Sequence, residues 1–404
     1  MNPLEQHREA THSPNTRSGA IPFNRPCLAG NEYQYIAEAI ANGHASGDGP
    51  FTRRCSELLK QELGVPEVLL TPSCTDALEM AALLLHCGPD DEVIVPSFTF
   101  VSTANAFALR GARIVFADIR PDTLNLDETR LEALITRRTK AVVPVHYAGV
   151  SCAMDEILSI AKRRGVKVVE DNAHGLFSRF KGRYTGTFGC LATQSFHETK
   201  NFTCGEGGAL IVNDPDLVER ALIIRDKGTN RSRFYRGQVD KYTWVELGSS
   251  YLLSDFLAAF LYAQLEARER IQTKRLRVWN YYYGQLHDWA QSGEVKLPVV
   301  PEDCEHSSHM FYLLMPSRED RDSLIAHLMK NDILSVFHYV PLHLSDAGKT
   351  FMARQTDCHV AEGVSERLLR LPFYNDLTDS ELSLVVDTVR RFSVRAGAGT
   401  GIAS

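Results

Sequence analysis

The sequence predicts an α/β fold with a large domain built on a central, mostly parallel sheet and a smaller α+β domain behind it. Between residues 65 and 170, short β-branched runs alternate with helical patterns, which is the βαβ signature of a parallel sheet. The strand runs are apolar on both faces, so we expect helices on both sides of the sheet. From about Pro298 the pattern changes to strand, helix, strand and two terminal helices, which predicts a second unit.

The elements of the large domain follow one another in regular alternation. Strands are expected at 67–72, 91–96, 113–119, 139–146 and 166–171, and helices at 75–88, 99–112, 126–135 and 153–165. Two more strands, 191–196 and 208–214, are separated by too few residues for a crossover helix, which favours an antiparallel pair. An amphipathic pattern over 252–286 predicts one or two helices that lead out of the domain.

The small domain is expected to contain a strand at 309–316, a helix at 320–332 and a strand at 333–341. The polar start of the chain and its Gly/Ala/Ser end are typical of disordered termini. The predicted division is therefore a disordered arm, the large domain with its linking helices, the small domain and a disordered tail, over residues 1–20, 21–295, 296–393 and 394–404.

The composition favours a soluble globular protein. Hydrophobic residues make up 44% of the 404 residues and charged residues 23%, and the net charge is -6, so neither a nucleic-acid surface nor a membrane surface is indicated. The nine cysteines are scattered and contain no CxxC pair, which argues against a disulfide framework or a zinc site and fits a reducing cytoplasm. We expect a cytoplasmic protein that binds neither nucleic acid nor membranes.

The stretch TPSCTDALEM begins at Thr71, at the end of a predicted strand, and opens a helix. Its first turn contains Ser73, Cys74 and Thr75. Free backbone N–H groups at such a helix start form an anion site that suits a phosphate. Taken alone, simple capping of the helix is the more common explanation.

Two further residues stand where a site could form. Asp171 in VVEDNAHG follows a predicted strand, at the edge where open α/β sheets bind ligands, and a buried acid there needs a cationic partner. An ordinary helix cap explains Asp171 equally well. Lys200 in SFHETKNFTCGEGG stands between a strand and a glycine-rich turn; burial would depress its pKa and make the amine a nucleophile. Most lysines, however, are solvated surface groups.

Together, a phosphate cradle, an acid at a strand end and a lysine in a later loop match the three polar groups of pyridoxal 5'-phosphate (PLP), namely its phosphate, ring nitrogen and aldehyde. Phe100 in PSFTFVSTAN is a candidate to stack on the ring, although core packing is the commoner role for such a residue.

At these residues the sequence resembles the DegT/DnrJ/StrS family of sugar aminotransferases, which have the aspartate aminotransferase-type (fold type I) fold. The resemblance runs from about Ile21 to Phe392 and rests on SGDGPFTRRC, PSFTFVSTANAF, PVHYAG, VVEDNAHG, SFHETKN and FHYVPLH. KGTNRSRFYRGQVDKYTW and GSSYLLSD resemble the branch that aminates TDP-4-keto-6-deoxyglucose.

The resemblance implies a role for each matching residue. Lys200 would be the Schiff-base lysine and the acid/base that moves a proton at the cofactor, and Asp171 would keep the pyridine nitrogen protonated. His174 would face the phenolic oxygen and Phe100 would stack on the ring. The phosphate would be held by Ser73, Cys74, Thr75 and Ser195. The sugar nucleotide would contact His338, Tyr339, His343 and, by charge alone, Arg231.

The resemblance also implies a reaction and an assembly. L-glutamate would donate the amine, pyridoxamine 5'-phosphate (PMP) would carry it, and a TDP-4-keto-6-deoxy sugar would accept it, with the galactose configuration of the product favoured. A homodimer with the site between its subunits is expected. Many relatives donate an asparagine to the phosphate of the other subunit, where this chain has Ser250. Relatives that dehydrate the sugar replace the lysine by histidine, so the retained Lys200 favours amino transfer.

The sequence also bears on four other functions. A 3-keto sugar nucleotide remains an alternative acceptor. A dinucleotide-dependent dehydrogenase would need GxGxxG where this chain has TPSCTD. A regulatory or scaffold relative would have lost a cofactor group, and a metal hydrolase built on His338 and His343 lacks both helical spacing and an acidic motif.

Overall fold

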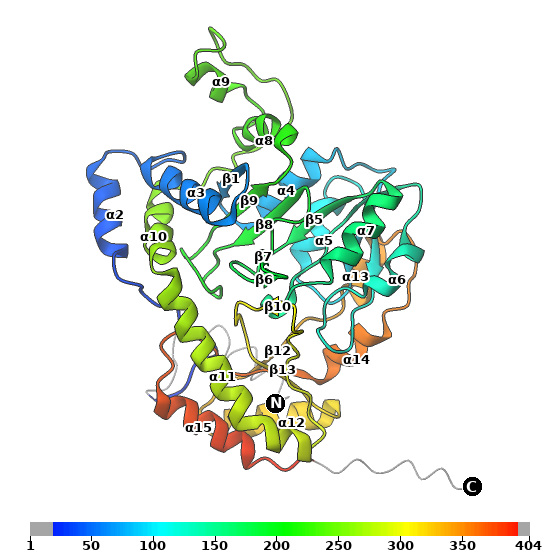
Figure 1. Ribbon diagram of the computed structural model, residues 1–404. Coiled ribbons are helices and arrows are strands. Elements are labelled where there is room, and N and C mark those ends of the chain that lie inside the picture. The colour runs from blue at the N-terminus through cyan, green and yellow to red at the C-terminus, as the bar shows by residue number, and fades with distance from the viewer. Residues whose placement is uncertain (1–18, 395–404) are drawn as a thin grey trace.

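A seven-stranded sheet forms the centre of the protein, as the computed structural model shows for residues 19–394 (Figure 1). The strand order is β1-β9-β8-β5-β4-β2-β3. The strands are β1 (Glu67–Thr71), β2 (Glu92–Pro96), β3 (Arg113–Ala117), β4 (Thr139–Val142), β5 (Lys167–Asp171), β8 (Leu191–Ser195) and β9 (Gly208–Val212). The predicted arm and tail lie outside the described residues except for residues 19, 20 and 394.

One strand of this sheet runs against the others. β9 is antiparallel to both β8 and β1, whereas the β2–β3, β2–β4, β4–β5 and β5–β8 pairs are parallel. Ser195 pairs with Gly208 in the β8–β9 register. The expected mostly parallel sheet with an antiparallel β8–β9 pair is confirmed, because the short connection cannot carry the chain back across the sheet.

Helices cover both faces of the sheet. They include α4 (Cys74–Leu84), α5 (Val101–Ala108), α6 (Glu128–Leu134), α7 (Met154–Arg164) and α8 (Val218–Arg225). Alternate residues of a strand enter different cores: Leu69 packs in the cluster under α4, while Val68 and Leu70 pack in the cluster on the other face. Because helices bury the strands on both faces, the strand sequences are apolar throughout.

Two N-terminal helices, α2 (Glu32–Ala41) and α3 (Pro50–Leu63), pack on α10 (Asp255–Glu266). Asp255 is fully buried and accepts hydrogen bonds from the backbone N–H and the hydroxyl of Thr52, at 2.8 and 2.9 Å. A Cβ on Gly49 would lie 2.2 Å from the Asp255 carboxyl carbon, so only glycine allows this approach. The SGDGPFT stretch is thereby anchored to the helix that leads out of the sheet.

The small domain is arranged around the long helix α11 (Arg268–Ser292). Its three-stranded antiparallel sheet has the order β11 (Tyr312–Leu314), β13 (Leu368–Arg370) and β12 (Val336–Phe337). The helices around it are α12 (Arg318–Met329), α13 (Asp346–Phe351), α14 (His359–Arg367) and α15 (Asp379–Arg390). α10 and α11 meet at Ala267, so the amphipathic pattern over 252–286 forms two helices.

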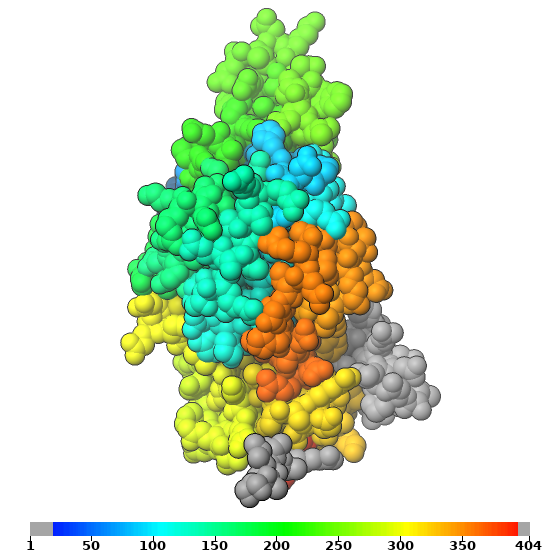
Figure 2. Space-filling view, turned by 90° about the vertical axis from the view of Figure 1, so that its right-hand side faces the viewer, coloured from blue at the N-terminus to red at the C-terminus, as the bar shows by residue number. Residues whose placement is uncertain are grey.

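The two domains exchange segments across the expected boundary near residue 295, which stays a proposal. Ile21 forms a bridge with Ile333 and packs in the small-domain core, although it is the first residue of the predicted large domain. Conversely, β10 (Cys304–Glu305) pairs with β6 (Arg179–Phe180), which pairs with β7 (Arg183–Tyr184). Figure 2 shows the α13 to α14 region, in orange, lying against the large domain, where the Asp118 carboxylate accepts from the Val360 and Ala361 N–H groups.

A short helix, α9 (Arg231–Tyr235), projects away from the sheet with the segment that follows it (Figures 1 and 2). Its large apolar side chains face solvent, including Tyr235 and Trp244, which are 69% and 71% exposed. Within residues 19–394, no helix combines the length and the apolar character that crossing a bilayer requires.

Candidate active site

Lys200 lies in the loop between β8 and β9, as the sequence predicts. This loop begins at the carboxyl end of β8. The backbone of this loop is held by a hydrogen bond from Lys200 N–H to the His197 carbonyl, at 2.9 Å. The Lys200 amine makes no hydrogen bond or ion pair with any residue of the 19–394 region. Desolvation by the surrounding protein lowers the pKa of Lys200 to about 8, and the charge of Arg370 acts in the same direction. Near neutral pH, roughly a tenth of the amine is therefore uncharged and nucleophilic.

Asp171 closes β5 and is held on two sides. The Thr103 hydroxyl donates to one carboxylate oxygen at 2.7 Å and the Ala173 N–H donates to the other at 3.2 Å. Burial raises the pKa of Asp171, while these hydrogen bonds and the charge of Lys200 oppose that rise. No cation of residues 19–394 is bonded to this buried carboxyl group, so a protonated ring nitrogen fits as its partner.

The start of α4 forms the expected anion site beside the end of β8. The Ser73 hydroxyl caps the helix by accepting from the Asp76 N–H at 3.1 Å, so the free donors are first-turn backbone N–H groups rather than this hydroxyl. The backbone of Gly208 touches the same turn: a Cβ there would lie 2.4 Å from the Cys74 nitrogen and the Ser73 carbonyl carbon. Because Gly208 pairs with Ser195, the Ser195 side chain is brought next to this helix start.

Three histidines stack on one another, and the charge of Lys200 acts on the pKa of each of them. The ring of His174 lies 4.2 Å from that of His309 and 6.3 Å from that of His338, and burial lowers the pKa of all three, so they are neutral near pH 7. Two of the three rings form a hydrogen bond with another side chain. Asn201 contacts His309 Nδ1 at 2.9 Å, and the Tyr147 hydroxyl contacts His338 Nδ1 at 2.7 Å. His174 Nδ1 is buried with no hydrogen-bond partner among the described residues. That unpartnered nitrogen fits the predicted contact with a ring oxygen of the cofactor.

The other predicted residues divide into two groups. Phe100 lies before α5, is 56% exposed, and has its ring 6.4 Å from that of Tyr339, whose neighbour His338 stacks with it. His343 instead uses both ring nitrogens inside the protein, with Ser97 at 2.6 Å and Glu362 at 3.0 Å. Its predicted sugar contact therefore has no free nitrogen to use in this conformation.

Arg231 and Ser250 stand apart from this cluster. Arg231 lies on α9, where it donates to the Tyr235 hydroxyl at 2.7 Å, and Ser250 is exposed in a bridge with Asp226. The resemblance assigned Ser250 to the site of the other subunit and Arg231 to a diphosphate by charge alone. Neither contacts the Lys200 cluster of its own chain, so both roles remain proposals that require a second subunit.

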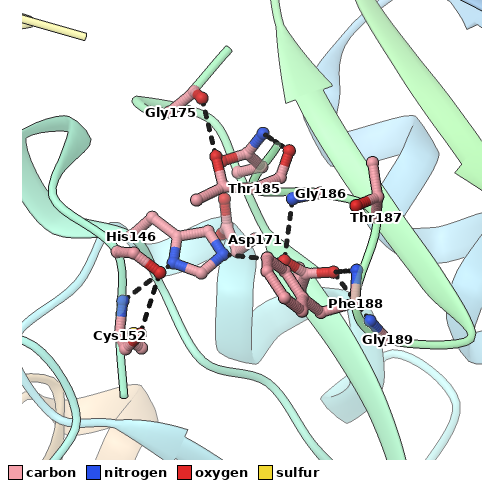
Figure 3. A network of polar contacts seen from close by, with 12 residues as sticks. His146, Cys152, Asp171, Gly175, Thr185, Gly186, Thr187, Phe188 and Gly189 are labelled. Carbon is pink, nitrogen blue, oxygen red and sulfur yellow. Dashed lines mark hydrogen bonds and ion pairs between the residues drawn. The ribbon is translucent and has the colours of Figure 1, made fainter. Parts of the chain in front are cut away.

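A buried network holds the strand end behind Asp171 (Figure 3). The Glu170 carboxylate accepts backbone N–H groups of Gly186, Phe188 and Gly189 at 2.6–2.7 Å and contacts His146 Nε2 at 2.9 Å. The Cys152 N–H donates to His146 Nδ1 at 3.1 Å, which places the imidazole proton on Nε2, toward Glu170. The buried Glu170 carboxylate thus has four hydrogen bonds, and it is the residue next to Asp171 in β5.

A profile of the DegT/DnrJ/EryC1/StrS aminotransferase family matches residues 26–390. The chain belongs to this family. It is 32% identical to the spore coat polysaccharide biosynthesis protein SpsC of Bacillus subtilis over 382 residues, which cover 93% of this chain and 97% of SpsC. The match confirms the expected family, while the TDP-4-keto-6-deoxyglucose branch stays a proposal.

Solved aminotransferase structures share the fold of this chain over most of its length. The aminotransferase TlmJ of Streptoalloteichus hindustanus is 31% identical, with a TM-score of 0.84 over 92% of this chain and 98% of TlmJ. The putative sugar aminotransferase Spr1654 of Streptococcus pneumoniae is 27% identical, with a TM-score of 0.84 over 92% of this chain, and 98% of its own chain in the PLP form and 97% in the PMP form. The expected PLP-dependent aminotransferase of fold type I is thus confirmed.

The family's cofactor, PLP, fits the site on three observations within residues 19–394: the Asp171 carboxyl group has no cation bonded to it, the Lys200 amine has no hydrogen-bond partner, and Gly208 closely approaches the start of α4. When bound, PLP withdraws electrons from the carbon that bears the amine. Sequence reasoning missed Thr103, His309 and Arg370. Their residue types recur throughout the chain, and only the fold brings them to the site formed by Asp171 and Lys200.

Proposed function

We propose that this aminotransferase moves an amine from L-glutamate to TDP-4-keto-6-deoxy-D-glucose and forms a TDP-4-amino-4,6-dideoxyhexose, with the galactose configuration favoured. The observation that carries the proposal is Lys200, a lysine with a pKa of about 8 next to the Asp171 carboxyl group. A solvated structural lysine would keep a pKa of ~10.4. The retained lysine also favours amino transfer over dehydration of the sugar.

Each site residue has a distinct part in this reaction. The Lys200 amine accepts the proton from the donor's α-carbon and returns a proton to the sugar carbon that receives nitrogen. Asp171 holds the proton on the pyridine nitrogen, and His174 Nδ1 faces the ring oxygen. The first-turn N–H groups of Ser73, Cys74 and Thr75, with the Ser195 hydroxyl, hold the phosphate, and Phe100 covers the ring.

The acceptor is proposed to bind between the two domains. His338 and Tyr339 are candidates to contact the sugar ring, because the His338 ring stacks with those of His174 and Tyr339. His343, which is tied to Ser97 and Glu362, would have to exchange a partner to reach the same ligand. The similar protein SpsC is a spore coat polysaccharide biosynthesis protein, which supports a sugar acceptor.

The exposed segment around α9 supports a homodimer with shared sites. Tyr235, Tyr242, Trp244 and Leu247 are each at least half exposed, which is unusual for so many large apolar side chains in one segment. Covering them with a second copy would also bring Ser250 and Arg231 into contact with another chain. We place the enzyme in the cytoplasm, where reduced cysteines such as the nine free ones here persist.

Two other functions stay open to test. The same residues could aminate a 3-keto sugar nucleotide, because the position of the keto group depends on how the sugar is seated. A regulatory or scaffold relative of this fold would not react with an amino donor.

The test is spectroscopic. The protein is purified with PLP, and its visible absorbance is followed as L-glutamate is added, with Lys200→Ala as the matched variant. Loss of the visible band in wild type alone establishes the donor half-reaction. TDP-4-keto-6-deoxyglucose is then added, and the amine position and configuration of the product are read by NMR. A wild type that never forms the visible band would favour the regulatory function, and a 3-amino product would favour the alternative acceptor.

A further inference from the structure

The segment 307–309 connects β10, which pairs with a strand of the large domain, to β11 of the small-domain sheet. The Ser307 N–H donates to the Gly149 carbonyl at 3.2 Å, and the Ser307 hydroxyl donates to the His174 carbonyl at 2.6 Å. A Cβ on Gly149 would lie 1.9 Å from the Ser307 hydroxyl oxygen, so this approach requires glycine. The main chains that carry His174 and His309 are therefore fixed relative to each other.

Helix α11 also holds this segment. Arg275 is buried and donates through Nη2 to the His309 carbonyl at 2.5 Å and through Nε to the Ser308 carbonyl at 3.1 Å. Gln272 donates to the Ser307 carbonyl at 2.6 Å. These bonds reach the carbonyl groups of all three residues, so they fix the backbone of the segment. The ring of His309 is held by a different group.

That group is the amide of Asn201, the residue that follows Lys200 in the chain. Its Nδ2 donates to the Ser307 carbonyl at 2.7 Å, and its Oδ1 lies 2.9 Å from His309 Nδ1. Only the nitrogen of an amide can bond a carbonyl, so the oxygen faces the imidazole. Because an amide oxygen can only accept, the neutral His309 ring carries its proton on Nδ1. One amide thus fixes both the orientation and the tautomer of this ring.

We propose that Asn201 is a positioning residue that acts on His174 through His309: its amide fixes the His309 ring, and that ring supports His174 by stacking. The two rings lie 4.2 Å apart at an angle of 18°. Neither ring nitrogen of His174 has a hydrogen-bond partner within residues 19–394, so packing has to orient this ring. The inference rests on the proposed function, in which His174 Nδ1 faces the ring oxygen of the cofactor.

An amide suits this position better than a carboxylate. Burial lowers the pKa of His309, and the neighbouring groups that can carry a positive charge lower it further; these are His174, Lys200, Arg275 and Arg370. Asn201 accepts the Nδ1 proton without adding a charge, so the stacked rings stay neutral. A carboxylate would attract a second proton to the His309 ring and place a positive charge against His174.

The test is a double-mutant cycle of Asn201→Ala and His309→Phe, in which apo-protein is titrated with PLP. Phenylalanine keeps a flat ring but has no Nδ1 proton for Asn201 to hold. Since one neutral hydrogen bond is lost, each single variant should bind PLP about 3- to 10-fold more weakly. The double variant should bind no more weakly than His309→Phe, because Asn201 acts through that ring. An anchor that works only through the Ser307 carbonyl would instead give additive losses.

A second measurement needs no cofactor. In NMR spectra of apo-protein with isotope-labelled histidine, the His309 signal is identified by its absence in His309→Phe. It should show a protonated Nδ1 in wild type and a mixture of tautomers in Asn201→Ala. Asn213→Ala is the matched control, because the Asn213 amide also donates to backbone carbonyls but lies at the opposite end of β9 from Gly208. It should change neither PLP affinity nor the His309 signal.

Three results would overturn the assignment: unchanged PLP affinity in Asn201→Ala, an additive loss of about 10- to 100-fold in the double variant, or a wild-type His309 with its proton on Nε2. If the cycle is non-additive but L-glutamate leaves the visible band of wild type intact, the proposed function fails while the positioning role stands. If L-glutamate removes that band and the losses are additive, the proposed function stands without this role of Asn201.

Discussion

The Thr103 hydroxyl donates a 2.7 Å hydrogen bond to the buried carboxylate of Asp171, across 68 positions of sequence. The first turn of α5 therefore controls the acid that the cofactor's ring nitrogen would meet. Thr99 contacts the same hydroxyl at 3.0 Å, which orients it. Burial alone would push Asp171 toward its neutral form, and this bond is the largest of the effects that oppose it.

Thr103→Val should weaken cofactor binding. Valine keeps the shape but removes the donor, so the pKa of Asp171 rises and the carboxylate becomes a poorer partner for a protonated pyridine. A hydrogen bond to a charged group contributes about 1.5–3 kcal/mol, so PLP affinity should fall about 10- to 100-fold, measured by titrating apo-protein. Thr273→Val, an exposed change on α11, is the control; equal affinities in both variants would contradict the role of Thr103.

Lys200 should react with amine reagents at a lower pH than other lysines. Its pKa of about 8 means that labelling of the apo-protein, followed by mass spectrometry, has its midpoint near pH 8, against ~10.4 for exposed lysines. Because the folded pKa lies below the unfolded value, the charged lysine destabilises the fold at pH 7, and this penalty fades between about pH 8 and 10.5. Lys200→Met should accordingly raise Tm at pH 7 and have little effect at pH 10.5. A labelling midpoint above pH 10 would refute the shift.

Glu170→Gln should be strongly destabilising. The amide presents N–H groups to backbone donors of the 186–189 turn, which leaves buried hydrogen bonds unmade and His146 without its acceptor. Breaking a buried network of this kind costs about 3–5 kcal/mol, which urea unfolding can measure. Glu305→Gln removes an exposed charge 4.0 Å from Arg179 and should change stability by less than about 1 kcal/mol. Similar results for the two variants would disprove the importance of the network.

Gly208→Ala should damage the phosphate site. The added methyl group would collide with backbone atoms of Ser73 and Cys74, so the start of α4 must shift. We expect PLP affinity to drop at least 10-fold, with a lower Tm. Gly284→Ala is the control: it lies within α11 with nothing within 4 Å of its Cβ, and it should stabilise the protein by about 0.5–1 kcal/mol. Normal PLP binding by Gly208→Ala would show that the phosphate binds elsewhere.

Trp244→Asp should shift the protein from dimer to monomer. A charge in the exposed apolar segment after α9 opposes its burial against a second copy, and sedimentation velocity measures the mass. Leu384→Asp, a similar change at a side chain that is 45% exposed on α15, should leave the mass unchanged. A wild-type monomer would rule out the shared site.

Much of the local structure was predictable because periodicity is a local property. The alternation of strands and helices between 67 and 171, the antiparallel β8–β9 pair and the two long helices after 252 all agree with the pattern. The strand expected at 333–341 is much shorter, since only Val336–Phe337 pairs with β13 and Tyr339 adopts a φ of +42°, outside the β region. Its apolar and aromatic residues fitted the strand pattern, although the backbone leaves the β region after Phe337.

The sequence by itself determined the fold class, the family and the positions of Lys200 and Asp171, because these depend on periodic burial and on contiguous motifs. Only the tertiary structure decided that Thr103 meets Asp171, that His309 stacks on His174, and that His343 is occupied by Ser97 and Glu362. It alone tied Asn201 to His309. Such contacts join residues far apart in the chain, and their energies come from burial and charge at a single place in space, which no local pattern encodes.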